Sequence, residues 1–158
     1  MKKLLLLLLC VPLIGFGQQT YVPDDNFEDY LESNGMGNGI PNDDYVLNSN
    51  IYMVTNLDVS NQNISDLTGI EGFYSLEYLY CYSNQLISID ITQNIFLEEL
   101  ACNDNNLSSL DINQNIFLNY LDCKTNNLSS LDVNQNDSLR ALYCSNNQLT
   151  TLDVSNNI

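Results

Sequence analysis

Tyrosine and carboxylate side chains recur at regular positions in the second half of the chain, and their chemistry suits them to bind a ligand. The set consists of Tyr78, Tyr80, Tyr82, Glu99, Tyr120, Asp122, Lys124 and Tyr143. Tyrosine supplies rigid, amphipathic contact area at low entropic cost, and its ring can also stack on a sugar. If these residues share one face of a sheet, we expect a ligand-binding surface. The alternative is that the rings pair across strands and stabilise the sheet without a ligand.

A second recurrence places one aspartate in every 21 residues, at Asp90, Asp111, Asp132 and Asp153. Carboxylates stacked on neighbouring strands about 4.8 Å apart repel each other. Calcium could bridge them, but the glycine-aspartate motif of calcium-binding repeat rolls is missing. We favour a solvated row that serine hydroxyls and turn amides partly satisfy. We therefore predict no metal site and no cofactor, with calcium at this row as the alternative.

The acidic side chains also raise the question of catalysis. Glu99 and Asp122 occupy diagonal positions expected to lie roughly 7–8 Å apart, a spacing that an inverting glycosidase uses. Any acidic sheet contains such pairs, however, and the chain has no histidine and no nucleophile motif beside them. We therefore predict that the protein is not an enzyme.

A 21-residue tandem repeat must position these side chains. LEELACNDNNLSSLDINQNIF is followed directly by LNYLDCKTNNLSSLDVNQNDS, and the same register carries Cys81, Cys102, Cys123 and Cys144. Within one unit, apolar Leu118, Leu121 and Cys123 alternate with Tyr120 and Asp122, as in a short strand with one buried face. The second half of each unit repeats the leucine spacing, which predicts a second sheet on the opposite side.

The asparagines and cysteines of the repeat are expected to be scaffold. Asn84, Asn105, Asn126 and Asn147 end the predicted strands, because asparagine tolerates left-handed backbone and its amide can bond to open main-chain groups. Cysteines on neighbouring coils would lie about 4.8 Å apart, whereas the Cβ atoms of a disulfide prefer roughly 3.8 Å. We therefore favour a buried ladder of free thiols over disulfide bridges.

The chain divides into three segments. Residues 1–17 have the basic start and short apolar run of a secretory signal peptide, and the run is shorter than the roughly 20 residues of a membrane span. Residues 18–53 form an N-terminal helical cap, with a helix capped by Asp24 or Asp25 and ended by Asn34-Gly35, and with a second short turn over 45–51. Residues 54–158 hold about five coils, the last incomplete, so we expect a longer gene product.

The net charge and the predicted export limit the kinds of partner that the protein can bind. The chain has 20 acidic and 4 basic residues, giving a net charge of −16, and such a chain repels nucleic acid. With the signal peptide removed, no transmembrane segment is expected in the mature chain. We predict a secreted, extracellular or cell-surface protein.

The units LEYLYCYSNQL, LEELACNDNNL, LNYLDCKTNNL and LRALYCSNNQL resemble the leucine-rich-repeat family, whose pattern is LxxLxLxxNxL. The 21-residue length resembles a bacterial class, and VPDDNFEDYL is similar to the N-terminal caps of internalin-like proteins. The resemblance implies a right-handed repeat solenoid of short parallel β-strands and loops, with a short α-helical cap. It also implies a binding module for a protein partner. A surface glycan as the partner, or a passive spacer role, are the alternatives.

Overall fold

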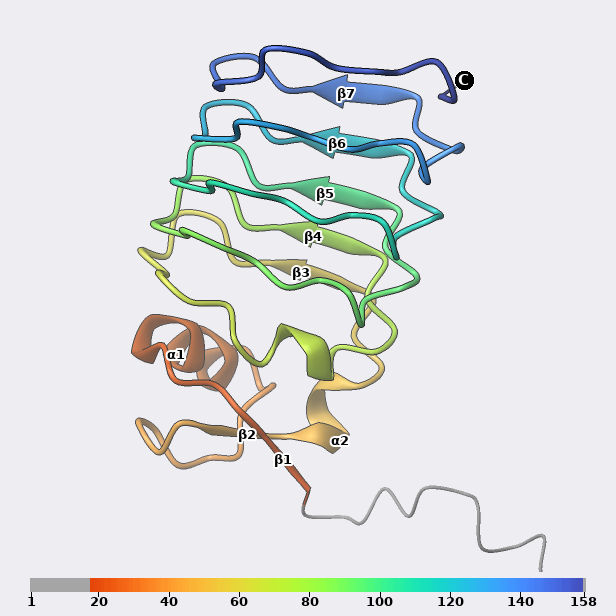
Figure 1. The fold of residues 1–158 in the computed structure, drawn as a ribbon. Coiled ribbons are helices and arrows are strands. Elements are labelled where there is room, and N and C mark those ends of the chain that lie inside the picture. The colour runs from red at the N-terminus through yellow and green to blue at the C-terminus, as the bar shows by residue number, and fades with distance from the viewer. Residues whose placement is uncertain (1–17, 158) are drawn as a thin grey trace, which may run out of the picture.

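Each repeat contributes one three-residue strand to a five-stranded parallel sheet. The strands are β3 Asn56–Asp58, β4 Tyr78–Tyr80, β5 Glu99–Ala101, β6 Tyr120–Asp122 and β7 Ala141–Tyr143. The computed structural model describes residues 18–157, and in it the strands lie one above the next along the molecule (Figure 1). Leu79, Leu100 and Leu121 are register partners on successive strands. The predicted solenoid of short parallel strands and loops is therefore confirmed.

The central residue of each strand points into an apolar core that runs the length of the stack. Leu57, Leu79, Leu100 and Leu121 are at most 1% exposed. Cys81, Cys102 and Cys123 are fully buried beside them, and all are free thiols, as is the partly exposed Cys144. Burial raises the pKa of the Cys81 thiol to about 12, which keeps it neutral and apolar in character. The prediction of a thiol ladder is confirmed.

An asparagine ladder joins the turns that follow the strands. The Asn105 amide nitrogen donates to the carbonyl oxygens of Cys81 and Cys102, at 3.0 and 3.1 Å, and its side-chain oxygen accepts from the Leu86 amide at 3.0 Å. This confirms the scaffold role. The left-handed backbone, however, falls on the residue before each asparagine, with φ of 52–56° at Ser83, Asp104, Thr125 and Asn146. The prediction for that detail was one residue out of place.

The expected second sheet does not form. In the described residues, the second half of each coil contains turns and extended loops instead of strands. A second asparagine ladder replaces the strand hydrogen bonds there: the buried Asn115 amide nitrogen donates to the carbonyl oxygens of Ile91 and Asn94, at 3.0 and 2.9 Å. Equivalent contacts are made by Asn94, Asn136 and Asn157. Because side chains bridge the coils, the backbones need not pair directly.

The N-terminal cap covers the lower end of the stack (Figure 1). It contains β1 Gln19–Tyr21, α1 Asp25–Ser33, β2 Tyr45–Leu47 and α2 Asn48–Ile51. Asp24 caps α1 by accepting from the Asn26 and Phe27 amides, and its other oxygen accepts from the Ser65 amide of the first coil at 2.8 Å. The Phe27 ring stacks on Phe73, with centroids 6.4 Å apart. The Asp24 side chain therefore both caps the start of the helix and ties it to the repeats.

The cap matches the sequence prediction at its first helix and differs from it after residue 44. The helix and its Gly35 turn, with φ of 73°, are as expected, but residues 45–47 form a strand antiparallel to β1 in place of a simple turn. The first coil also contains a short 3-10 helix, η1 Ile70–Gly72, where its sequence departs from the repeat. The predicted signal peptide, residues 1–17, lies outside the described residues, and the boundary between cap and repeats at residue 53 stays a prediction.

Candidate functional site

The predicted binding residues lie on the face of the parallel sheet that points away from the apolar core. We call this surface the inner face. Its side chains form rows that run across the strands. Register pairing places Tyr78, Glu99 and Tyr120 in the first row. The second row consists of Tyr80, Ala101, Asp122 and Tyr143. Tyr82, Asn103 and Lys124 follow just past the strand ends. The 21-residue period is what brings residues so far apart in sequence into contact.

A hollow of about 350 Å³ lies in the middle of the inner face. Its lining consists of Tyr80, Tyr82, Glu99, Ala101, Asn103, Tyr120 and Asp122. The hollow exists because Ala101 is small and stands between larger side chains on both neighbouring strands. Lys124 and Tyr143 adjoin the lining, whereas Tyr78 stands apart from it.

One side of the hollow is held by a tyrosine-carboxylate hydrogen bond. The Tyr80 hydroxyl donates to Oε2 of Glu99 at 2.9 Å. Burial, and then the bond to Glu99, raise the pKa of Tyr80 to about 12. The neighbouring Tyr78 also has a raised pKa, mainly because the Glu98 carboxylate opposes a second negative charge. Tyr80 is therefore a fixed, neutral hydrogen-bond donor over the whole physiological pH range.

Tyr80 should ionise only at a pH well above that of an ordinary tyrosine. Because its folded-state pKa of about 12 exceeds the ordinary 10, the folded protein favours the neutral phenol. Ionisation of Tyr80 should therefore not change the free energy of unfolding below pH 10. That free energy should fall as the pH rises from 10 to 12. Tyrosinate absorbance of the wild type minus that of Tyr80→Phe isolates the titration, and Glu99→Gln should lower the measured pKa. A wild-type Tyr80 pKa near 10 would contradict the hydrogen bond.

The other side of the hollow is held by an ion pair beside an aromatic pair. Nζ of Lys124 lies 3.1 Å from Oδ2 of Asp122 and 5.4 Å from the centre of the Tyr143 ring. The Tyr143 ring in turn lies 5.6 Å from that of Tyr120, tilted by 48°. The bond to Asp122, and then its charge, raise the pKa of Lys124. These contacts restrain four side chains together, so the surface is ordered before any ligand arrives.

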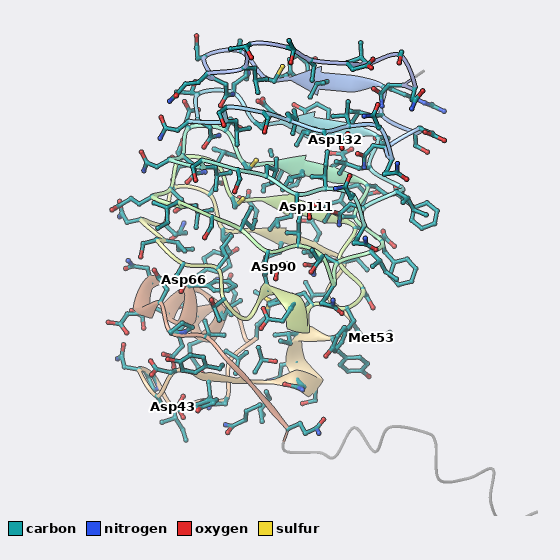
Figure 2. All side chains as sticks on the ribbon, in the orientation of Figure 1. Asp43, Met53, Asp66, Asp90, Asp111 and Asp132 are labelled. Carbon is teal, nitrogen blue, oxygen red and sulfur yellow. The ribbon has the colours of Figure 1, made fainter. Side chains whose placement is uncertain are left out.

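The aspartate row lies away from the inner face, on exposed loops. Figure 2 shows Asp90, Asp111 and Asp132 in a rising line on successive coils. Each carboxylate accepts a hydrogen bond from the amide two residues later, as Asp111 does from Asn113 at 3.0 Å. The Thr92 hydroxyl also donates to Asp90, and this bond lowers the Asp90 pKa.

The row thus has turn amides as partners, as expected, but at Asp90 the hydroxyl comes from Thr92, two residues after the aspartate, and not from the preceding Ser88. Asp153 belongs to the same series: the Ser155 amide donates to it at 2.9 Å, and this bond lowers its pKa. Within residues 18–157, no three histidine, cysteine or acidic residues lie close enough together to hold a metal ion.

The sequence reasoning missed an exposed apolar ridge beside the sheet. Its members are Tyr74, Ile95, Phe96, Ile116 and Phe117, each 45–54% exposed. They occupy the last two positions of successive coils. The signal was the dipeptide Ile-Phe at 95–96 and again at 116–117, which does not fit the alternation that marks the core. We assign no function to this ridge.

Solved structures share this architecture, although no protein-family model and no curated protein matches the chain. The functional domain of InlJ from Listeria monocytogenes, described as including a cysteine ladder, is 38% identical with a TM-score of 0.81 over 91% of this chain and 32% of its own. A Leptospira interrogans leucine-rich-repeat protein is 30% identical, with a TM-score of 0.61 over 63% of this chain and 27% of its own.

Internalin C2 from Listeria monocytogenes shows the same fold at 24% identity, with a TM-score of 0.61 over 65% of this chain and 46% of its own. The chain therefore spans less than half the length of each of these structures. None of the three is named as an enzyme. No helix in the described part of the chain is both long and apolar enough to span a bilayer.

This chain has a parallel-strand solenoid like these structures, and its ladder of free cysteines corresponds to the cysteine ladder that the InlJ domain is described as including. Such a fold presents a broad, ordered surface and supports a general role in protein interaction. The chain is an internalin-like, bacterial leucine-rich-repeat protein.

Proposed function

We propose that the chain is a secreted or cell-surface module that binds a protein partner non-covalently through its inner face. The observation that carries this proposal is the ordered group of tyrosines there. Tyr80 is fixed by Glu99, while Tyr120 and Tyr143 contact each other and Lys124, paired with Asp122, lies over the Tyr143 ring. Tyrosines restrained before binding lose little side-chain entropy in a complex, and tyrosine is among the residues enriched at binding hot spots.

The composition supports a secreted or surface location and a macromolecular partner. The predicted signal peptide over residues 1–17 directs export, and a net charge of −16 disfavours nucleic acid and anionic lipid. The hollow is shallow and open on the sheet surface, which suits a protruding side chain of a partner better than an enclosed substrate. No histidine is present to serve as a general base. Recognition is therefore the activity that the inner face supports best.

Removing inner-face tyrosines should strongly weaken partner binding. The test variant changes Tyr80, Tyr120 and Tyr143 to serine, and the matched control changes the exposed Tyr21, Tyr45 and Tyr74 to serine. The control is well matched because Tyr21 and Tyr45 also form an aromatic pair with centroids 5.6 Å apart. Hits from a panel of purified extracellular protein domains, measured by biolayer interferometry, should bind the test variant more than about tenfold more weakly.

The control variant should keep its affinity within about twofold, because surface tyrosines outside an interface contribute little to binding. Circular dichroism melts must show both variants folded. Equal affinity of the test variant and the wild type would contradict the proposal. Inhibition of binding by a free sugar would assign the same face to a glycan, and an absence of any ligand for the wild type across protein and glycan panels would leave the chain a spacer.

A further inference from the structure

The hollow on the inner face has a chemical character that points to one kind of occupant. We propose that it receives an arginine side chain from the partner, with the guanidinium on Glu99 and between tyrosine rings. This inference rests on the proposed function, because it names the part of the partner that the inner face would bind. It goes further in assigning a site, a side-chain type and a pair of contacts.

The shape of the hollow suits a long, flat side chain. Ala101 forms its floor and is 7% exposed, with Tyr80 and Asp122 as its register partners on the two neighbouring strands. Glu99 stands beside it, flanked in its own row by Tyr78 and Tyr120. A planar group entering over Ala101 would therefore be within reach of the Tyr80 and Tyr120 rings and of the Glu99 carboxylate, all of which line the hollow.

The charge of the hollow favours a cation. Asp122 is 7% exposed and already pairs with Lys124, which is the only ion pair among residues 18–157. Glu99 has no cationic partner in that part of the chain. Its Oε2 accepts from Tyr80, and its Oε1 accepts no hydrogen bond from any described residue. The lining thus contains one compensated and one uncompensated carboxylate, which leaves it net negative.

Arginine matches these features better than the other cationic groups. Its guanidinium is planar, stacks on aromatic faces and presents several N–H donors to one carboxylate, whereas a lysine ammonium is a compact, strongly hydrated charge. An anionic phosphate or sulfate would be repelled by Glu99. A neutral sugar could stack on the rings but would leave the carboxylate without a counter-charge. The geometry therefore favours a protein segment that carries an exposed arginine.

The test uses Nα-acetyl-arginine amide as the probe, titrated into the ¹⁵N-labelled folded protein. We expect saturable shifts of the backbone amides of Glu99, Ala101 and Tyr120. Nα-acetyl-norleucine amide, which lacks the charge, should bind at least about fivefold more weakly. Absence of shifts at these three amides, or equal binding of norleucine, would overturn the proposal.

Two variants locate the contact. Glu99→Gln keeps an acceptor for the Tyr80 hydroxyl but removes the charge, and it should weaken probe binding about tenfold. Ala101→Leu fills the floor and should abolish binding. The matched control is Asp111→Asn, which removes the same charge from an exposed loop and should change binding by less than about twofold. Equal loss in Asp111→Asn and Glu99→Gln would mean that only the overall charge matters.

The outcomes separate this inference from the proposed function. If the tyrosine variant loses its protein partner while Glu99→Gln and Ala101→Leu keep it, the inner face binds a protein and the arginine pocket is wrong. If the probe binds as expected but the tyrosine variant keeps its protein partner, the pocket exists and the proposed function is wrong. Stronger binding of a chitosan hexamer than of an arginine-containing hexapeptide would assign the pocket to amino sugars and overturn the proposal.

Discussion

Replacing Leu121 with alanine should lower the free energy of unfolding by about 2–5 kcal/mol. Leu121 is the central residue of β6, is fully buried, and has Leu100 and Leu142 as its register partners. Its neighbours above and below belong to other coils whose positions are fixed by their own hydrogen bonds, so they cannot collapse fully into the space left behind. Urea unfolding followed by circular dichroism measures the change.

The control for Leu121 is the same substitution at Leu152, which is 37% exposed in the last coil. It removes identical atoms, but part of that surface already faces water, so the loss should be about 1 kcal/mol or less. Because each coil packs only on its neighbours, the effect of Leu121→Ala should extend to both flanking coils. Equal losses at the two positions would mean that the assigned register of the repeat is wrong.

Much of this fold follows from the spacing of apolar residues. In a strand with one buried face, every second residue must be apolar, and this rule places Leu121 and Cys123 inside and Tyr120 outside, while Leu118 is buried just before the strand begins. The cysteine position could be recognised as core because the first coil carries Val59 in that slot. The 21-residue period then fixes which residues become neighbours, without any further information.

The second half of the coil shows why the same pattern can mislead. Leu107, Leu110 and Ile112 have the strand-like spacing and are buried as expected, yet no strand forms there in the described residues. Apolar spacing reports which side chains face the core. It does not report whether a carbonyl bonds to a neighbouring backbone or to the amide of Asn115, and here the side chain takes that place.

The candidate site was predictable as a face and not as a hollow. The period alone aligns Tyr78, Glu99 and Tyr120 in one row. The depth of the surface over Ala101, by contrast, depends on differences in side-chain length between neighbouring coils. In the cap, β1 pairs with β2, so that Thr20 lies opposite Val46. Each of these strands has only three residues and is too short to show an alternating pattern. Such long-range pairings leave little local signal.

The second large effect should come from Asn115→Asp, which exchanges one amide nitrogen for an oxygen of nearly the same size. Asn115 is fully buried, and its amide nitrogen donates to the carbonyl oxygens of Ile91 and Asn94. A carboxylate in its place has no proton to donate and faces two carbonyl oxygens without water. At neutral pH we expect a loss of about 3–5 kcal/mol in the free energy of unfolding.

The loss should depend on pH in a direction that identifies its cause. Burial and the facing carbonyls favour the protonated acid, so the folded-state pKa of the new aspartate is raised above its unfolded value of about 3.9. The variant is therefore least destabilised below about pH 4, and the penalty grows as the pH rises towards the folded-state pKa. Melting temperatures across this range, compared with the exposed Asn106→Asp in the same coil, measure the effect. If the two variants show the same pH profile, the Asn115 amide is not the donor that holds neighbouring coils together.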